Sequence, residues 1–293
     1  MRETPPTLLI TGASGFLGST ISRMARNRGY RIIAQARRPA PGIDIAGDLS
    51  AAEGVQSLPL KLITHVIHCA AAVPAKSAEF ERDNALLATT LAASLADAKH
   101  MARIVNISSV SVYKKPTSGP YTIRESSPVI EDNGPGDEYA KSKRAAEGAF
   151  ELLRERSNAD VIHLRPSSIY GHGMRLNSLL PVLVTKALRG EALKLHGANA
   201  YTQNFVHVSD VADLALTACL SEKTFGHVVN AFSNDTFAVH DLAELVRKTM
   251  GSTSEIIDET SDVPVGIPTF ENEIARELIG EFRDLSTHLR DAL

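Results

Sequence analysis

The first half of the chain alternates short apolar runs with amphipathic stretches. In the first amphipathic stretch, Leu17, Ile21 and Met24 recur at spacings of three and four residues, the period of a helix with one apolar face. Short strands that alternate with helices indicate a parallel sheet with crossover helices. The apolar runs predicted to form its strands lie at 7–11, 31–36, 65–71 and 103–109.

The alternation extends into the second half. Further strands are predicted at 160–166, 204–208 and 227–232, so the sheet is expected to continue past the midpoint of the chain. Glycine, proline and serine are concentrated at 115–136 and 166–177, which predicts loops at the carboxyl ends of strands, where α/β proteins bind ligands. Helices are predicted around 178–189, 210–220, 238–250, 271–279 and 284–292, and the tail from Gly251, which contains Pro264 and Pro268, resembles a small helical cap.

Composition places the chain among folded globular proteins. Of its 293 residues, 43% are hydrophobic and 22% are charged. Lysine and arginine number 31 against 34 acidic residues, a net charge of −3 that lacks the positive excess of a nucleic-acid binder. There is no run of about 18 apolar residues and no apolar segment of a signal peptide at the N-terminus. We therefore expect neither nucleic acid nor a membrane as a partner.

Cysteine and histidine usage argues against disulfide and metal chemistry. Cys69 and Cys219 lie in apolar surroundings and are not spaced as metal ligands or as a redox motif, which fits a reducing cytoplasm. The histidines form neither HExxH nor a Cys/His cluster. The expectation is a cytoplasmic protein without a catalytic metal.

A glycine-rich turn joins the first predicted strand to the first helix. TGASGFLG at 11–18 places Gly12, Gly15 and Gly18 three residues apart. The first glycine permits a sharp turn, the second lets the backbone approach a pyrophosphate, and the third lets the helix pack closely on the sheet. A glycine-rich turn is often only a turn, but a strand before it and a helix after it predict a dinucleotide site.

The residues that end the second strand favour NADP over NAD. An NAD site usually places an acidic side chain there to bind the ribose 2′-hydroxyl, whereas this strand ends at Ala36 and is followed by Arg37 and Arg38. Arginine can bind a 2′-phosphate through two hydrogen bonds. The alternative is that both arginines are solvated loop residues, since exposure is the default for arginine. NADP is the predicted cofactor, with NAD as the alternative.

A helix predicted at 138–150 carries a tyrosine and a lysine on one face. Tyr139 and Lys143 are four residues apart, which is one helical turn. A nearby ammonium favours the phenolate form of a tyrosine, whose ordinary pKa is about 10, and makes the phenol a usable proton donor or acceptor. Ser109, at the carboxyl end of its strand, can hydrogen-bond a substrate oxygen. Such a pair also occurs on ordinary helix surfaces, but the order of glycine turn, serine strand and tyrosine helix favours catalysis.

Several motifs together resemble the extended short-chain dehydrogenase/reductase family and, within it, the NAD-dependent epimerase/dehydratase branch. They are TGASGFLG, GDL at 47–49, HCAA at 68–71, SSVSVY at 108–113, YAKSK at 139–143, LRPSSIYG at 164–171 and FVHVSDVA at 205–212. The resemblance implies an α/β fold with a Rossmann-like doubly wound parallel sheet and a smaller, mostly helical C-terminal cap that binds the substrate. The NADP-binding domain is then expected at 1–170, continued by 204–232, and the cap at 171–203 and 233–293.

The resemblance also implies roles for individual residues. Ser109, Tyr139 and Lys143 would be catalytic, and the latter two would also bind the nicotinamide ribose. His68 would be a strand residue beside the cofactor, and we expect a hydrogen-bonded core histidine rather than a base. The other cofactor-binding positions would be Gly12, Gly15, Phe16 and Leu17 at the pyrophosphate, with Gly18 in the same turn, Asp48 and Leu49 at the adenine, Cys69, Ala70 and Ala71 at the adenosine, and Pro166 and Ser168 near the nicotinamide.

Departures from the family pattern indicate a reductase. Val110 and Ser111 follow Ser109, where family dehydratases carry an Asp-Glu pair, and the second strand lacks the acid that epimerases commonly use with tightly bound NAD. Gln203 and Asn204 stand where nucleotide-sugar members of the family usually present an arginine. This departure weakens the prediction of a nucleotide-sugar substrate without excluding that substrate class.

The resulting prediction is an NADP(H)-dependent oxidoreductase that reduces a keto group of a sugar, with a nucleotide-linked 4-keto-hexose as substrate. The alternatives are a nucleotide-sugar 4-epimerase with tightly bound NAD and a non-catalytic NADP-sensing regulator. Family relatives pair through the helices that correspond to 84–99 and 138–156, so a homodimer is expected.

Overall fold

The computed structural model describes residues 5–73, 79–98, 100–116, 118–131, 137–196, 202–223, 225–259 and 266–292. Part of the predicted loop at 115–136, and Pro264, lie outside these residues. Contacts divide the chain into two units. The first comprises 1–113, 128–165 and 212–229, and the second comprises 114–127, 166–211 and 230–293.

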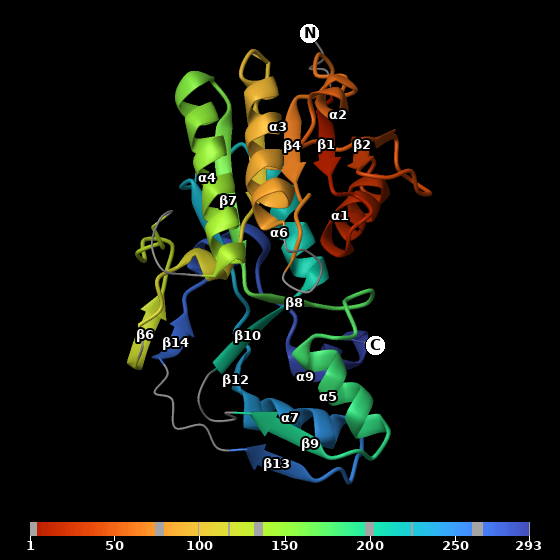
Figure 1. Cartoon of the computed structure of the whole chain (residues 1–293), viewed down its shortest axis with the longest axis vertical. Helices are drawn as coiled ribbons and strands as arrows, with labels where there is room; N and C mark the ends of the chain where they lie inside the picture. Colours follow the sequence, from red (N-terminus) through yellow and green to blue (C-terminus); the bar gives the residue numbers. More distant parts are fainter. Residues whose placement is uncertain are drawn as a thin grey trace. The chain divides into compact units, whose positions relative to one another are not determined.

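The first unit is built on a mainly parallel sheet (Figure 1). Its strands are β1 (Thr7–Thr11), β2 (Arg31–Ala36), β3 (Ile45–Ala46), β4 (His65–His68), β5 (Arg103–Ile107), β7 (Asp160–Pro166) and β11 (Val228–Ala231). Within the described residues they form seven strands in the order β11-β7-β5-β4-β1-β2-β3, and the pairs from β7 to β3 are all parallel. The predicted parallel sheet with crossover connections is confirmed.

Both faces of this sheet are covered. Val66 of β4 packs against Leu91 and Phe150 from two helices on one face. Its neighbour Ile67 points to the opposite face and is also fully buried. The helices are α1 (Phe16–Asn27), α2 (Ala52–Gln56), α3 (Leu87–Leu95), α4 (Glu138–Arg156) and α6 (Val208–Leu220), with a π-helix η1 (Glu81–Leu86) and a 3-10 turn η2 (Val110–Val112). The sheet is therefore doubly wound, as predicted.

The second unit contains short strands as well as helices. The strands are β6 (Gly119–Ile123), β8 (Ser168–Tyr170), β9 (Leu193–His196), β10 (Thr202–His207), β12 (Thr236–Ala238), β13 (Ile256–Glu259) and β14 (Gly266–Phe270). β10 pairs with β8 and β12, β13 with β9, and β14 with β6. The expectation of a mostly helical cap did not include these strands.

One sheet prediction is wrong. The segment at 204–208 was expected to extend the main sheet, but it forms most of β10, which pairs in parallel with β8 and antiparallel with β12. β8 itself lies in the segment 166–177 that was predicted as a loop. An apolar run indicates that a strand forms, but its partner is selected by packing that the local pattern does not contain.

Helices lie at the predicted positions in the second unit. They are α5 (Leu179–Leu188), α7 (Val239–Thr249), α8 (Glu273–Ile279) and α9 (Leu285–His288), and a 3-10 turn η3 (Leu289–Ala292) ends the described chain. Leu183, Leu242 and Leu285 belong to one buried apolar cluster in this unit. None of the helices described is both long and apolar enough to cross a membrane.

Candidate active site

The glycine turn between β1 and α1 has the shape that a phosphate site requires. Gly12 has a φ of +64°, and a Cβ at this position would lie 2.7 Å from the backbone of Ala70. A Cβ on Gly18 would collide with the carbonyl oxygen of Gly12, so both positions require glycine. α1 begins after Gly15 with no side-chain cap and no acidic residue in its first turn. Its first amides are therefore free of side-chain acceptors and fit an anion.

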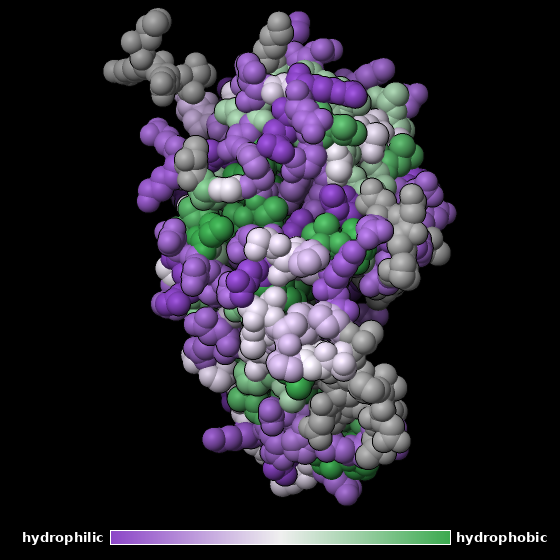
Figure 2. Space-filling view, turned by 90° about the vertical axis from the view of Figure 1, so that its left-hand side faces the viewer, coloured by the Kyte–Doolittle hydropathy of each residue, from purple (hydrophilic) through white to green (hydrophobic). Residues whose placement is uncertain are grey.

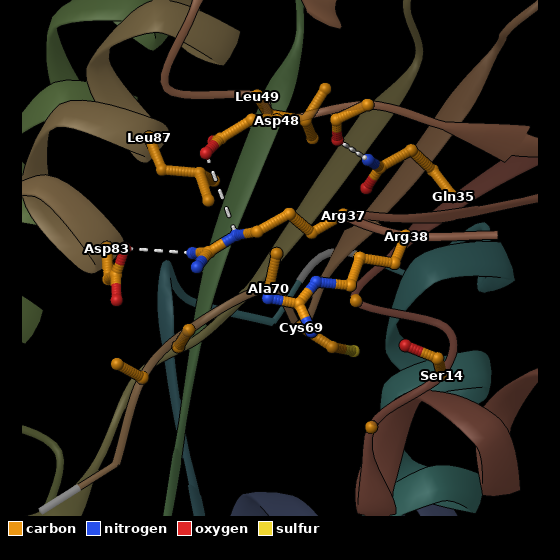
Figure 3. Close-up of a pocket in the computed structure, with 15 residues that line it drawn as sticks. Ser14, Gln35, Arg37, Arg38, Asp48, Leu49, Cys69, Ala70, Asp83 and Leu87 are labelled. Carbon is orange, nitrogen blue, oxygen red and sulfur yellow. Dashed lines mark hydrogen bonds and ion pairs between the residues drawn. The ribbon is translucent and has the colours of Figure 1, made fainter. Parts of the chain in front are cut away.

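A cavity of about 450 Å³ lies beside this turn (Figure 3). Its size is within the range of small-molecule sites. The sequence-predicted cofactor residues that line it are Gly12, Gly15, Arg37, Arg38, Asp48, Leu49, Cys69, Ala70 and Ala71. Phe16, Leu17 and Gly18 form the first turn of α1, whereas Pro166 ends β7 and Ser168 begins β8, both in the second unit. Because this cavity opens at the ends of β1, β2 and β4, next to the phosphate turn, the residues present fit the adenosine half of a dinucleotide.

The cavity contains carboxylates that the sequence reasoning did not connect with the arginines. Arg37 donates from Nη2 to Asp83 Oδ1 at 2.8 Å, and its Nε lies 3.7 Å from Asp48 Oδ2. Burial opposes ionisation of Asp48, but hydrogen bonds from Ser50 and the charge of Arg37 hold the pKa of its carboxyl below the ordinary value. The second strand ends without an acid of its own, as predicted, but folding brings two acids to the arginine that follows it.

Lys143 is held at the carboxyl end of β5. Its Nζ is buried and donates to the carbonyl oxygen of Ile107 at 2.6 Å. Ser109, two residues further along, is also buried, and its Oγ accepts a hydrogen bond from the backbone amide of Ser111 at 3.1 Å. The structure thus brings the lysine of α4 to the segment that carries the serine.

Tyr139 lies one turn before Lys143 on α4. The helix begins immediately before it, where Asp137 accepts a hydrogen bond from the amide of Ala140 at 2.5 Å as the N-cap. The Tyr139 ring is half-buried and meets the Phe80 ring edge-on, with 5.8 Å between centroids. The N-cap fixes the first turn of the helix, which carries Tyr139, and the contact with Phe80 holds the tyrosine ring.

Burial lowers the pKa of two groups near this segment. It lowers the pKa of Lys143 to about 8, although Cys69 and Glu147 oppose the change. It lowers the pKa of His68 to about 3, and the Nδ1 of this histidine lies 2.9 Å from Thr11 Oγ1. His68 is therefore a neutral, hydrogen-bonded core histidine, as expected.

Asn84 is a structural residue of the site that the sequence reasoning missed. Its side chain is buried, accepts a hydrogen bond from the amide of Ala72 at 2.6 Å and donates to Ser142 Oγ at 2.9 Å. It thereby links η1, the segment after β4 and α4, the helix that carries Tyr139 and Lys143. The sequence feature that indicates it is a polar residue at a helical spacing from Leu87 and Leu91, on the apolar face of the predicted helix.

Comparisons with known proteins agree with this arrangement. A model of the NAD dependent epimerase/dehydratase family matches residues 8–231. A UDP-glucose 4-epimerase of Vibrio cholerae is 30% identical over 263 residues, which cover 84% of this chain and 76% of that protein. A dTDP-4-dehydro-6-deoxy-D-allose reductase of Streptomyces sp is 27% identical over 300 residues, covering 92% and 89%. The solved structure of MoeE5 in complex with UDP-glucose and NAD has a TM-score of 0.79 and 26% identity, and the match covers 98% of this chain and 97% of that one. The resemblance carried by the motifs is confirmed: the chain belongs to the NAD-dependent epimerase/dehydratase family of enzymes.

Proposed function

We propose that the protein is an NADP(H)-dependent oxidoreductase that reduces the keto group of a nucleotide-linked 4-keto-hexose. The observation that carries this proposal is the 2.6 Å hydrogen bond from Lys143 Nζ to Ile107, which holds the lysine beside the Ser109 segment, with Tyr139 one turn away on α4. A keto-sugar reductase from Streptomyces among the relatives supports the direction of the reaction. The dinucleotide is assigned to the first unit and the sugar to the second.

The residues of this site have complementary roles in the proposed reduction. When bound, the reduced dinucleotide would supply a hydride to the carbonyl carbon. Tyr139 donates its phenolic proton to the carbonyl oxygen, and Ser109 donates a hydrogen bond to the same oxygen as negative charge develops on it. The positive charge of Lys143 stabilises the phenolate that remains on Tyr139. The phosphate turn and Arg38 of the cavity would hold the cofactor during this step.

Replacement of the proton donor tests this function. We expect Tyr139→Phe to lower the turnover of a nucleotide-linked 4-keto-hexose with NADPH by about 10²–10⁴-fold, because general acid catalysis is lost. The affinity for NADPH, measured by its fluorescence, should remain within about threefold of the unmodified protein. The substitution removes at most one hydrogen bond to the uncharged nicotinamide ribose, which is weaker than a hydrogen bond to a charged group. Tyr30→Phe, outside the cavity, is the matched control and should retain turnover. Full activity of Tyr139→Phe would reject the assignment.

A nucleotide-sugar 4-epimerase with tightly bound NAD is the second candidate. The Vibrio cholerae relative and the two carboxylates beside Arg37 favour it. Such an enzyme would be purified with cofactor bound and would interconvert two sugars without net consumption of NADPH. Measurement of the dinucleotide released when the purified protein is denatured, together with product analysis, distinguishes the two. A non-catalytic NADP-sensing regulator ranks lower, and turnover of any keto sugar excludes it.

A homodimer, formed in the cytoplasm, is part of the same proposal. A surface groove between α3 and α4 is lined mainly by small and apolar residues, among them Ala92, Ala149 and Leu152, and Leu152 is 52% exposed. In the space-filling view, apolar patches alternate with polar surface on the face shown (Figure 2). An apolar seam between two helices can be buried by a second copy. Sedimentation of the full chain tests this state.

A further inference from the structure

A nearly buried carboxylate faces the cavity from the π-helix η1. The Asp83 side chain is 9% exposed, and its Oδ1 accepts hydrogen bonds from Arg37 at 2.8 Å and from Arg82 at 3.0 and 3.1 Å. Arg37, by contrast, is 45% exposed and reaches across the cavity to make this contact (Figure 3). The Arg37 side chain is therefore held on the η1 side of the cavity, and one of its amino groups is already occupied.

The two arginines that follow β2 point in different directions. In Figure 3, Arg37 extends toward Asp83 and Asp48, whereas Arg38 turns toward Cys69 and Ala70. Arg38 forms no ion pair within the described part of the chain, and its side chain lines the cavity. Its five N–H donors are thus available to a ligand that enters beside the phosphate turn.

Charge balance in the cavity depends on Asp83. Two arginines and two aspartates line it, so their formal charges cancel. A 2′-phosphate brings up to about two negative charges, as other phosphomonoesters do, and is repelled by the carboxylates that line the cavity. A 2′-hydroxyl is uncharged and does not experience this repulsion.

We propose that Asp83 is a specificity-determining residue that restrains Arg37 and weakens binding of a 2′-phosphate, so that Arg38 alone supplies the preference for NADP. This inference rests on the proposed function for the identity of the cofactor. Under this inference, Arg37 binds a side chain of the protein, whereas Arg38 binds the cofactor.

Binding of NADPH and NADH to the full chain, measured by cofactor fluorescence without any sugar, tests this division. Asp83→Asn should lower the dissociation constant of NADPH about tenfold, the equivalent of one charge-assisted hydrogen bond regained. The dissociation constant of NADH should stay within about twofold. Arg38→Gln should raise the dissociation constant of NADPH at least about tenfold, whereas Arg37→Gln should change this constant less than about threefold. The gain in Asp83→Asn should shrink at 0.5 M salt, because it is electrostatic.

Two further variants separate this charge effect from a structural one. In Asp83→Asn combined with Arg37→Gln, the gain should disappear, because no freed arginine remains. Glu79→Gln removes another carboxylate that pairs with Arg82, at 2.5 Å, but does not line the cavity. It should leave both affinities unchanged, and thermal unfolding confirms that each variant is folded.

The possible outcomes decide between distinct conclusions. If Asp83→Asn weakens NADPH more than NADH, Asp83 orients Arg37 for the phosphate, and the inference is wrong. Equal changes for both cofactors also overturn it. Affinities that change as expected without turnover of any keto sugar support the inference and reject the proposed reaction. A protein that binds neither dinucleotide overturns both.

Discussion

Two arginine–carboxylate pairs of the first unit differ sharply in their surroundings. Glu147 of α4 and Arg165 of β7 form two hydrogen bonds of 2.7 and 2.8 Å, and their side chains are 1% and 6% exposed. The pair between Arg37 and Asp83 has one bond of similar length, but Arg37 is 45% exposed to the cavity. A buried pair must stay intact, since separating it leaves a charge without water, whereas an exposed arginine stays partly hydrated and its pair contributes little to stability.

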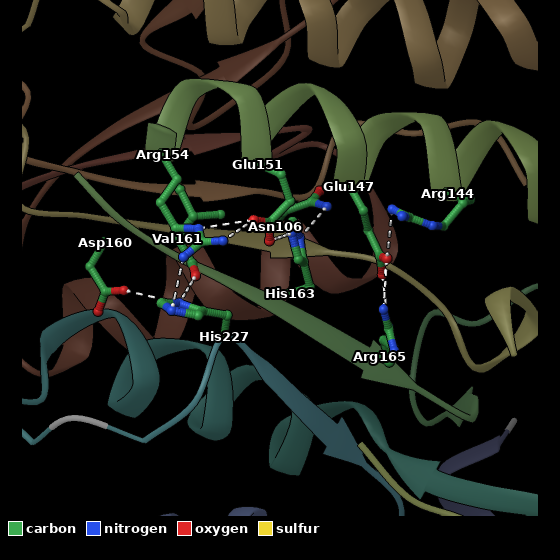
Figure 4. Close-up of polar contacts among 10 residues, drawn as sticks. All are labelled: Asn106, Arg144, Glu147, Glu151, Arg154, Asp160, Val161, His163, Arg165 and His227. Atoms are coloured by element: carbon green, nitrogen blue, oxygen red, sulfur yellow. Dashed lines mark hydrogen bonds and ion pairs between the residues drawn. The ribbon is translucent and has the colours of Figure 1, made fainter. Parts of the chain in front are cut away.

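The buried pair connects three segments that carry predicted site residues. Glu147 lies one turn after Lys143 on α4. Arg165 directly precedes Pro166, and its guanidinium lies 4.7 Å from the centre of the Tyr113 ring, which follows the Ser109 segment. In Figure 4 the pair belongs to a row of polar contacts between α4 and β7, in which His163 and Glu151 form the next contact at 2.9 Å. The comparison separates a buried pair, which holds the segments with the predicted site residues in place, from an exposed pair that tunes ligand binding.

Breaking the buried pair should have the largest effect on stability. Glu147→Leu leaves the Arg165 charge buried and unpaired, which should cost about 3–5 kcal/mol in the free energy of unfolding measured with urea. Replacing both residues by methionine should recover most of the loss, because the unpaired charge is removed as well.

An exposed pair provides the control. Arg28 and Asp213 lie 2.7 Å apart with side chains 39% and 36% exposed, so Arg28→Gln should cost less than about 1 kcal/mol. A loss of less than about 1 kcal/mol in the free energy of unfolding of Glu147→Leu would contradict the role of the buried pair in holding these segments in place.

Acid should weaken the same row of contacts. The hydrogen bond with His163 lowers the pKa of Glu151 to about 2, and Arg154 adds to this effect, while burial opposes it. A carboxyl with a pKa below its unfolded value of 4.5 stabilises the fold above that pH. Its contribution should be lost as pH falls from about 4.5 toward 2. Urea unfolding at a series of pH values should show a shallower acid slope for Glu151→Gln, and an unchanged slope would exclude this carboxyl as a source of acid sensitivity.

The contrast between the two pairs also explains what the sequence could predict. The glycine turn, the strands and the Tyr139–Lys143 spacing depend on neighbours within a few residues, so their local pattern was informative. Asp83 is 46 positions from Arg37, and Arg165 is 18 from Glu147, so both pairs arise only after folding. A charged residue in a predicted helix normally indicates a solvated face. The pattern of charges alone therefore gave no reason to expect that Glu147 is buried or that Asp83 lines a cavity.

The smallest effect should come from removing the exposed member of the cavity pair. Arg37→Gln should change the free energy of unfolding by only about 0–1 kcal/mol, because the guanidinium is largely hydrated and Asp83 keeps its hydrogen bonds from Arg82. The measurement is urea unfolding of the full chain beside Glu147→Leu under the same conditions. If Arg37→Gln cost as much as Glu147→Leu, the cavity pair would also hold segments of the fold together, and the distinction between a pair that stabilises the fold and a pair that tunes ligand binding would fail.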